Sequence, residues 1–344
     1  MNLSIAAFTK RGAALAIRLA DALAADGNPP PAVQVFGRAG GSKASLHDWT
    51  RDVFSQGGGI IYVGACGIAV RAIAPFVKDK LTDPAVVAVD ERGNYAVALL
   101  SGHVGGANAL AARVAKATGG TPVVSTATDL AGAFAVDVWA VEHSLRLGER
   151  ALAKAVSAAL LDGEPVGFES DFPVESALPA GLTAGRAGLG VCVTLDAEKR
   201  PFPCTLHAFP RIVTIGTGCR RGISGETFEW EVLGALAQSN IPLEAVRQLA
   251  TIDRKAGEPC ILAFCEQYGL PLVTASAEEL STVEGVFTPS EFVRGVTGVD
   301  NVCERAALFA ARDGRLIMGK HAGNGVTAAA AADRWTCTFW EDAE

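Results

Sequence analysis

The sequence predicts a multi-domain α/β protein, with N-terminal and C-terminal α/β domains of mostly parallel sheets joined by a small α+β middle region. Short apolar runs alternate with helical segments over roughly the first 130 residues, an order typical of a doubly wound domain. Two of these runs, at residues 59–64 and 85–89, are continuously apolar, as parallel strands buried on both faces are. The chain has 344 residues, enough for two to three domains at about 150 residues each.

In the N-terminal domain, residues 1–130, apolar runs predict the strands and apolar residues at helical spacing predict the helices. Ser45 is suited to cap the helix that follows it. Residues 90–94, Asp-Glu-Arg-Gly-Asn, are a turn signal, so residues 95–100 are expected to return as a strand. Strands are expected at residues 3–8, 33–36, 59–64, 85–89, 95–100 and 121–125, and helices at 13–25, 45–54, 68–77 and 109–118.

The middle region, residues 131–208, is mostly helical up to residue 161 and then rich in Pro and Gly. It holds short strand-like pieces, such as residues 191–195. The C-terminal domain, residues 209–344, opens with a strand and a helix and continues in the same alternation. Strands are expected there at residues 211–216, 248–252, 271–275, 316–318 and 326–332, and helices at 224–238, 258–268, 292–297 and 302–311.

Composition excludes several classes of protein. Apolar residues make 49% of the chain and charged residues 19%, which excludes intrinsic disorder. The net charge of −7 disfavours a nucleic-acid binder, which needs a basic surface. The longest apolar stretch ends at Arg71 and is too short to cross a membrane, and the first residues lack the order of a secretory signal. A cytoplasmic protein is therefore expected, with its eight scattered cysteines as free thiols, because neither C-x-x-C nor zinc-ligand spacing occurs.

The first candidate site is the loop SGHVGGAN, residues 101–108, between a strand and a helix. Its glycines allow a sharp turn that exposes backbone N–H groups at a helix N-terminus, which suits an anion or a developing oxyanion. His103 lies within it, and an imidazole titrates near neutrality, so it could act as a general base. A tight turn with a hydrogen-bonded histidine is the alternative. The residues singled out here are Ser101, Gly102, His103, Gly105, Gly106 and Asn108.

The second candidate site is the loop GTGCRRG, residues 216–222, again between a strand and a helix. Paired arginines at a glycine turn suit the capture of carboxylates or phosphates, although a solvated basic turn is an equal alternative. Cys219 is a weak candidate nucleophile, because the sequence assigns no histidine to it. Gly216, Gly218, Cys219, Arg220 and Arg221 are the residues expected to bind.

Three further stretches follow predicted strands. Gly64, Gly67 and Arg71 come after the strand at 59–64, and Asp253 and Lys255 come after the strand at 248–252. Lys320 precedes a Gly-Asn-Gly turn. Since open α/β sheets place ligands at the carboxyl ends of their strands, these loops are expected to converge. The cations among them predict a locally positive pocket for an anionic ligand in an otherwise acidic protein.

Several long motifs resemble the cobalt-precorrin-5A hydrolase family, CbiG, of anaerobic cobalamin biosynthesis. In the N-terminal part they are DPAVVAVD (residues 83–90), LLSGHVGGANALA (99–111) and TPVVSTATD (121–129). In the C-terminal part they are GTGCRRG (216–222), ATIDRKAGE (250–258) and PSEFVRGVTG (289–298). The resemblance covers most of the chain and is least distinctive in the middle region.

The resemblance implies a reaction and a ligand. The family opens the δ-lactone of cobalt-precorrin-5A and releases acetaldehyde, giving cobalt-precorrin-5B. The substrate carries many acetate and propionate carboxylates, which suits the arginine loop. Because cobalt arrives within the substrate, no resident cofactor or metal is implied. His103 is then the expected base, the amides of Gly105 and Gly106 are expected oxyanion donors, and Glu91 and Lys320 are weaker catalytic candidates.

Other functions stay open. A non-catalytic carrier of corrinoid intermediates could use the same arginine loops. A nucleotide-dependent α/β enzyme is disfavoured, because neither G-x-x-x-x-G-K-[ST] nor an N-terminal G-x-G-x-x-G occurs. A small-molecule substrate is expected, no nucleic-acid or membrane partner is, and a homodimer is left open.

Overall fold

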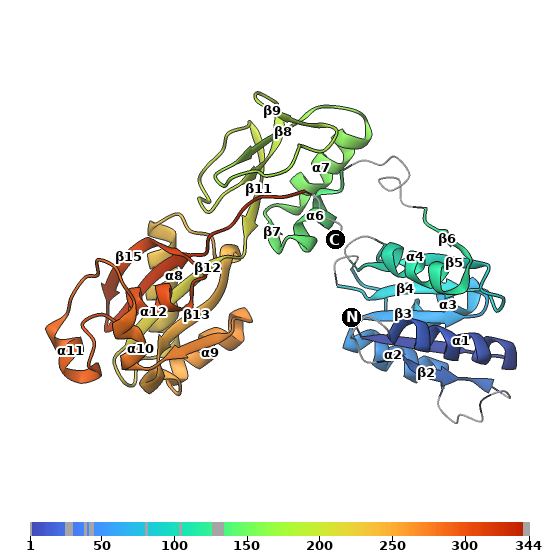
Figure 1. The fold of residues 1–344 in the computed structure, drawn as a ribbon, viewed down its shortest axis with the longest axis horizontal. Coiled ribbons are helices and arrows are strands. Elements are labelled where there is room, and N and C mark those ends of the chain that lie inside the picture. The colour runs from blue at the N-terminus through green and yellow to red at the C-terminus, as the bar shows by residue number, and fades with distance from the viewer. Residues whose placement is uncertain are drawn as a thin grey trace. The chain divides into compact units, whose positions relative to one another are not determined.

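The computed structural model describes residues 2–24, 30–37, 40, 45–79, 82–102, 105–125 and 134–339. The chain divides into two compact units, Met1–Val138 (the N-terminal unit) and Trp139–Glu344 (the C-terminal unit). Figure 1 shows one sheet in the first unit and two in the second. The three-domain division expected from the sequence, with boundaries near residues 130 and 208, stays a prediction.

The sheet of the N-terminal unit has the strand order β2-β1-β3-β4-β5-β6. All neighbouring strands are parallel except β4 and β5, which form an antiparallel pair. The strands are β1 (Leu3–Ala7), β2 (Ala32–Val35), β3 (Gly59–Val63), β4 (Ala85–Val89), β5 (Tyr95–Leu100) and β6 (Thr121–Val123). The doubly wound α/β domain expected here is confirmed.

Helices cover both faces of this sheet. On one face α1 (Lys10–Leu23) and α4 (Ala107–Thr118) bury apolar side chains against Ile5, Ile61 and Val87. On the other face α2 (Leu46–Gln56) and α3 (Cys66–Ile73) pack against Ile60 and Tyr62. Because β3 and β4 are apolar at every position, both of their faces find a covering layer, as the sequence predicted.

The first sheet of the C-terminal unit is formed by the middle region. Its order is β7-β11-β10-β8-β9, in which only β7 is antiparallel to its neighbour. The expected α+β arrangement is therefore corrected, since this sheet is largely parallel. The elements are α6 (Val136–Glu142), β7 (Leu145–Leu147), α7 (Arg150–Leu161), β8 (Val166–Ser170), β9 (Leu182–Ala184), β10 (Leu189–Val193) and β11 (Cys204–Pro210).

The second sheet of the C-terminal unit has the order β14-β13-β12-β16-β15. The strands β12 (Val213–Cys219), β13 (Val246–Ile252) and β14 (Leu272–Ala275) are parallel. The hairpin of β15 (Arg315–Gly323) and β16 (Val326–Ala332) joins β12 in antiparallel orientation. The expectation of a mostly parallel C-terminal sheet was wrong, because the final strand pair joins the sheet beside its first strand rather than through a helical crossover.

Helices again cover both faces of this sheet. The helices α8 (Gly225–Gln238) and α9 (Pro259–Tyr268) enclose one apolar core with β12 and β13. On the other face α10 (Ala277–Thr282) and α12 (Cys303–Ala310) pack against Ala250 and Ile252. The short helix α11 (Glu291–Thr297) buries none of its residues. Two 3₁₀ turns, η3 (Leu243–Ala245) and η4 (Asp253–Lys255), flank β13.

The segment after β16 returns to the middle sheet. The carbonyl oxygen of Thr338 accepts a hydrogen bond from the indole of Trp139 at 2.8 Å, and the ring of Phe339 stacks on that indole at 5.2 Å. Cys337 forms a β-bridge with Val174. This closing segment, residues 333–339, therefore ties the middle sheet to the C-terminal one. Within the described part of the chain, no helix is both long and apolar enough to cross a membrane.

Candidate functional site

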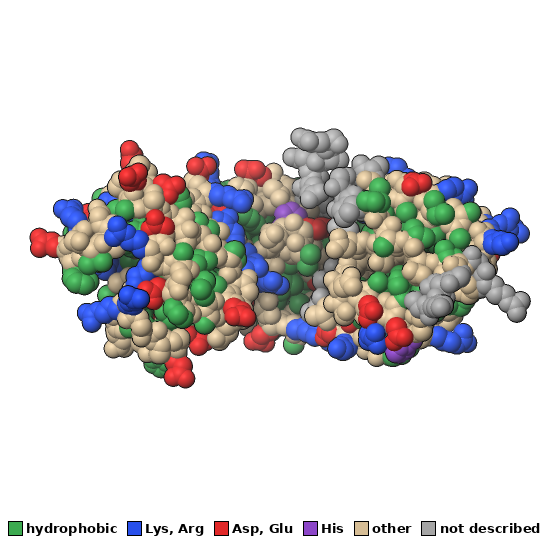
Figure 2. Space-filling view, turned by 90° about the horizontal axis from the view of Figure 1, so that it is seen from below, with side chains coloured by type: hydrophobic (Ala, Val, Ile, Leu, Met, Phe, Trp, Pro, Cys, Tyr) green, Lys and Arg blue, Asp and Glu red, His purple; other side chains and the backbone are tan. Residues whose placement is uncertain are grey.

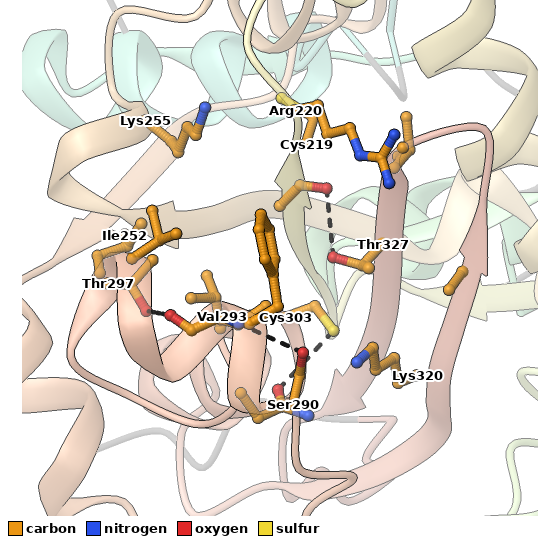
Figure 3. Close-up of a pocket in the computed structure, with 18 of the residues that line it drawn as sticks. Cys219, Arg220, Ile252, Lys255, Ser290, Val293, Thr297, Cys303, Lys320 and Thr327 are labelled. Carbon is orange, nitrogen blue, oxygen red and sulfur yellow. Dashed lines mark hydrogen bonds between the residues drawn. The ribbon is translucent and has the colours of Figure 1, made fainter.

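The main cavity of the C-terminal unit has a volume of about 620 Å³ and lies at the carboxyl ends of β12 and β13 (Figure 3). The β15–β16 hairpin, α11 and the start of α12 form the rest of its wall. Open α/β sheets commonly bind ligands at this edge. The lining residues are Gly218, Cys219, Arg220, Arg221, Ile252, Lys255, Ser290, Phe292, Val293, Val296, Thr297, Asn301, Val302, Cys303, Lys320, Ala322, Gly323, Asn324, Gly325, Val326 and Thr327.

Backbone pairing fixes the arginine loop to the hairpin. Cys219 is opposite Val326 in the antiparallel ladder, and the backbone N–H of Arg220 donates to the carbonyl oxygen of Gly325 at 2.8 Å. Asn324 and Gly325 both have positive φ, at 44° and 82°, which a tight two-residue hairpin turn requires. The turn therefore fixes the backbone of Arg220, the first arginine of the loop, at the wall of the pocket.

The charged side chains among the described lining residues are all cations. They are Arg220, Arg221, Lys255 and Lys320, and no Asp or Glu is among the described residues of the wall. Figure 3 shows Lys255, Arg220 and Lys320 around the cavity, each from a different element. The amine of Lys255 lies 2.6 Å from a carboxylate oxygen of Glu258, so its charge is partly compensated. The other three form no ion pair with any residue that the structure describes, which leaves them available to an anion.

The opposite part of the wall is apolar. Phe292 and Val296 of α11 are 74% and 56% exposed, and together with Val293 they line the cavity. Figure 2 shows hydrophobic side chains at the surface at the end of the C-terminal unit that carries α11, with Lys and Arg side chains beside them. A cavity with one apolar wall and a cationic rim suits a flat apolar body that carries carboxylates at its edge.

The pocket thiols are protonated at neutral pH. Burial, and secondarily the neighbouring Cys260 thiol at 3.7 Å, raises the pKa of Cys219 to about 12. Burial likewise raises the pKa of Cys303 to about 11. Since the thiolate is the nucleophile, this geometry gives no support to the weak prediction of a reactive Cys219.

Two predicted residues of the C-terminal unit lie outside this pocket. Gly216 packs under α12, where an added Cβ would lie 1.9 Å from the carbonyl oxygen of Cys303. Asp253 is exposed, and its carboxylate accepts the backbone N–H of Arg254 at 2.6 Å. The pocket therefore brings together six of the predicted residues, namely Gly218, Cys219, Arg220, Arg221, Lys255 and Lys320.

In the N-terminal unit, the carboxyl ends of β3 and β4 hold two predicted residues. The backbone N–H of Gly64 donates to the carbonyl oxygen of Val89 at 2.8 Å. Glu91 accepts a hydrogen bond from the hydroxyl of Thr9 at 2.7 Å, and that threonine caps α1. Gly64 thus lies at the carboxyl end of its strand, as expected, and Glu91 lies in the turn predicted after β4.

The loop at residues 101–108 lies at the opposite edge. Because β5 runs antiparallel to β4, it ends beside the start of β4, and a Cβ on Gly105 would lie 3.3 Å from the carbonyl oxygen of Asp83. Five residues of β4 separate this loop from Glu91, about 16 Å at the usual rise of a strand. The expectation that these loops converge at one edge was therefore wrong here.

The loop itself is strained and tightly turned. Ser101 has a φ of 56°, and its buried hydroxyl has no hydrogen-bond partner among the residues that the structure describes. Gly106, with a φ of 83°, precedes α4, and the backbone N–H of Asn108 donates to the carbonyl oxygen of Gly102 at 3.0 Å. His103, the predicted base, lies outside the described residues, so its role stays a prediction.

Of the predicted pair Gly67 and Arg71, only Arg71 is among the described residues that line a smaller cavity of about 320 Å³ on α2 and α3. The guanidinium of Arg71 donates to the carbonyl oxygen of Gly67 at 3.3 Å and lines this cavity beside His47. The described residues of the chain contain no cluster of three His, Cys, Asp or Glu side chains that could hold a metal ion.

Sequence reasoning missed the apolar wall of the main pocket. The missed residues on or beside α11 are Ser290, Phe292, Val293, Val296 and Thr297. They all lie within the motif PSEFVRGVTG, residues 289–298, which carried the family resemblance but was not assigned a role. That motif was the signal that could have located them.

Family models match three consecutive regions of the chain. "Cobalamin synthesis G N-terminal" matches residues 48–129, and "Cobalamin biosynthesis central region" matches residues 134–210. "Cobalamin synthesis G C-terminus" matches residues 213–331, which include most of the pocket.

Two individual relatives give the same result. The chain is 33% identical over 271 residues to the cobalt-precorrin-5A hydrolase of Salmonella typhimurium, covering 75% of this chain and 77% of the relative. It is 31% identical over 292 residues to that of Priestia megaterium, covering 79% and 78%. Among solved structures, a cobalamin biosynthesis protein G homolog from Sulfolobus solfataricus is 19% identical, with a TM-score of 0.43 over 96% of this chain and 97% of that one.

Proposed function

The chain belongs to the cobalt-precorrin-5A hydrolase family, as its motifs indicated, and we propose on this basis that it is itself a cobalt-precorrin-5A hydrolase. The family membership makes it a homologue of enzymes of cobalamin biosynthesis. The proposed reaction opens the δ-lactone of cobalt-precorrin-5A and releases acetaldehyde, leaving cobalt-precorrin-5B. We further propose that the reaction takes place in the cytoplasm.

The observation that carries the proposal is the composition of the main pocket. Three cations without an ion pair among the described residues, together with the partly paired Lys255, share a cavity of about 620 Å³ with the apolar side chains of Phe292, Val293 and Val296. A tetrapyrrole offers a flat apolar ring system with carboxylates at its periphery, which matches both kinds of wall. Arg220 and Arg221 are proposed to bind those carboxylates without taking part in bond breaking, since guanidinium groups stay protonated.

The chemistry requires one base and one set of donors. Water adds to the lactone carbonyl as a base removes its proton, and the acyl–oxygen bond breaks to give a carboxylate and an alcohol. Removal of the alcohol proton then lets the carbon–carbon bond break, which forms acetaldehyde, while the macrocycle carbon takes up a proton. We assign the base to His103 and the oxyanion donors to the amides of Gly105 and Gly106, and we keep Lys320 as a weaker catalytic candidate.

Glu91 is the weaker choice as a base. Its carboxylate already accepts the Thr9 hydroxyl, and it lies at the other edge of the sheet from the loop at residues 101–108. Cobalt is proposed to enter as part of the substrate, so no resident cofactor is assigned. A homodimer stays a prediction.

The test is an acetaldehyde assay. Purified protein is mixed with cobalt-precorrin-5A, and released acetaldehyde is measured by its reduction with alcohol dehydrogenase and NADH. The wild type is expected to release acetaldehyde, and His103→Ala is expected to abolish release while substrate still binds. His143→Ala is the control, because that ring bonds the carbonyl of Trp139 and lines neither described cavity.

The carrier alternative has one observation in its favour. Among its described lining residues, the main pocket contains no histidine and no carboxylate that could act as a base. Wild-type protein that binds the macrocycle but releases no acetaldehyde would favour a carrier over the proposed hydrolase. Full activity in His103→Ala would remove this histidine from the catalytic role.

A further inference from the structure

Glu304 is a buried acid that contacts the pocket wall and has no part in the proposed reaction. It lies in the first turn of α12 and is only 3% exposed. Its Oε2 accepts the backbone N–H of Thr288 at 2.7 Å and the side-chain amide of Asn301. Its Oε1 accepts the backbone N–H of Lys320 at 2.8 Å and the hydroxyl of Thr288 at 3.1 Å.

The donors come from three segments that build the pocket. Thr288 begins the stretch that leads through Ser290 into α11, and Asn301 lines the cavity at the start of α12. Lys320 is on β15, and Figure 3 shows its amine directed toward the side of the cavity where Ser290 lies. One carboxylate thus joins the apolar wall to the cationic rim.

Only uncharged donors satisfy this carboxylate. No Lys, Arg or His among the described residues lies within ion-pair distance of it. A buried charge without a counter-ion needs all of its hydrogen bonds, and bonds to a charged acceptor are shorter and stronger than neutral ones. The four hydrogen bonds to Glu304 therefore hold these segments together.

Other contacts attach the α11 wall to the segment before α12: the side-chain amide of Asn301 donates to the carbonyl oxygen of Thr288 at 2.9 Å, and the guanidinium of Arg294 lies 3.3 Å from a carboxylate oxygen of Asp300. The helix α11 has no fully buried residue, although Val293 packs partly against the apolar core beside α12. At its far end the carbonyl oxygen of Val296 accepts a hydrogen bond from the guanidinium of Arg254 at 2.8 Å. At its near end the backbone N–H of Ser290 donates to the carbonyl oxygen of Asp300. The hydrogen bonds of Glu304 join this near end to β15, since they connect Thr288 with the backbone of Lys320.

We propose that Glu304 is a positioning residue that sets the separation between the α11 wall and the Lys320 rim, and thereby the affinity of the pocket for a polycarboxylate macrocycle. The choice of ligand rests on the proposed function, whereas the link between the two walls rests on the hydrogen bonds alone. Glu304 does not touch the ligand in this scheme. It acts through Lys320 and through the start of α11.

Glu304→Gln breaks this link in either orientation of the new amide. Glutamine keeps one carbonyl oxygen and places an NH₂ group at the other position. If the NH₂ replaces Oε1, it faces the backbone N–H of Lys320; if it replaces Oε2, it faces the N–H groups of Thr288 and Asn301. Because two donors cannot bond to each other, one of the two walls is released.

The experiment measures binding of uroporphyrin, a tetrapyrrole with acetate and propionate side chains, by the change in its fluorescence. Glu304→Gln is expected to raise the dissociation constant about tenfold, as for the loss of one charge-assisted hydrogen bond. Thr288→Val removes only the hydroxyl donor and is expected to raise it about threefold. This second variant keeps the test open if the first does not fold.

Asp333→Asn is the matched control. Asp333 is also a nearly buried carboxylate of the C-terminal unit, but it pairs with Arg247 and the backbone of Arg312, none of which lines the pocket. It is expected to lower the melting temperature and leave the dissociation constant unchanged. A purely structural role for Glu304 would make the two variants alike.

Each outcome decides the proposal. Unchanged binding by Glu304→Gln, or an equal loss of affinity in Asp333→Asn, overturns it. So does a wild-type protein that binds no uroporphyrin. Failure of the acetaldehyde assay alone would refute the proposed hydrolysis, while the series of dissociation constants would still test the role of Glu304.

Discussion

Gly216→Ala gives the most direct test of the pocket's architecture. An added Cβ would lie 1.9 Å from the carbonyl oxygen of Cys303 and 2.5 Å from the backbone nitrogen of Ala307. Both atoms belong to the buried side of α12, so the helix must withdraw from β12 by roughly 1.5 Å to restore an ordinary contact of 3.4 Å. Overpacking of a core costs about 1–3 kcal/mol, and a clash with helix backbone should reach the upper end of that range.

This loss of stability should be measurable by thermal unfolding. The gain from a less flexible unfolded chain offsets about 0.5 kcal/mol of the cost, which leaves a net loss of about 2.5 kcal/mol. For a unit of about 200 residues this lowers the melting temperature by roughly 5–10 °C. The measurement is calorimetry, which separates the transitions of the two units where they differ.

Gly218→Ala is the matched control from the same strand. Its added Cβ would lie 3.1 Å from the hydroxyl of Thr327, a side-chain end that can rotate away, and 3.9 Å from Val302. The melting temperature should change by less than about 2 °C, whereas the methyl group enters the cavity and should weaken uroporphyrin binding. An unchanged melting temperature for Gly216→Ala would refute the packing role of Gly216. Ligand binding would then again be the better explanation for a glycine at this position.

Three further predictions concern charge and thiol chemistry. Replacing Arg220 and Arg221 together by Ala should weaken uroporphyrin binding by up to about a hundredfold and make the dissociation constant less dependent on salt concentration. Arg200→Ala is the control and should change neither property, because Arg200 lines neither described cavity. A double variant with the salt dependence of the wild type would contradict the cationic rim. Because burial raises the pKa of Cys219 to about 12, iodoacetamide near neutral pH should modify the exposed Cys66 and spare Cys219, as mass spectrometry can check. The same raised pKa of Cys219 predicts that its contribution to the free energy of unfolding is constant below the thiol's ordinary pKa of 9.0 and is lost as pH rises from there toward about 12. The reason is that the thiol ionises first in the unfolded chain. Alkylation of Cys219 as fast as that of Cys66 would refute both thiol predictions.

The direction of β5 shows what a local sequence pattern can predict about the fold. The turn at residues 90–94 correctly predicted that the chain returns as a strand. A strand that follows a tight hairpin runs backward, so its end lies at the opposite edge from the end of β4. The convergence of loops was nevertheless expected at one edge, because the rule for parallel sheets was applied to an antiparallel strand. The turn chemistry contained the information that corrects this error.

The main pocket was predictable only in part. Arg220, Arg221, Lys255 and Lys320 were found because charge at a glycine turn is unusual enough to suggest a ligand. The exposed position of Phe292 could not be found, since an apolar residue on a short helix reads as core. Its exposure depends on how α11 is placed by contacts that are distant in sequence.

Gly216 and Gly218 show the same limit within one motif. They lie two residues apart on the same face of β12, yet one packs under a helix and the other lines a cavity. Both satisfy the same local pattern, so the sequence assigned them the same role. Only the position of α12 above the strand distinguishes them.

The closing segment, residues 333–339, has a consequence for how this gene could be divided. A fragment that stops at the end of β16 would leave the indole of Trp139 without its hydrogen-bond acceptor and would uncover the ring of Phe168, on which Phe339 packs. Expressing the middle region by itself would expose the same aromatic surface. A workable split of the polypeptide therefore keeps both sheets and their shared tail together, even though family models place a border at residues 210–213.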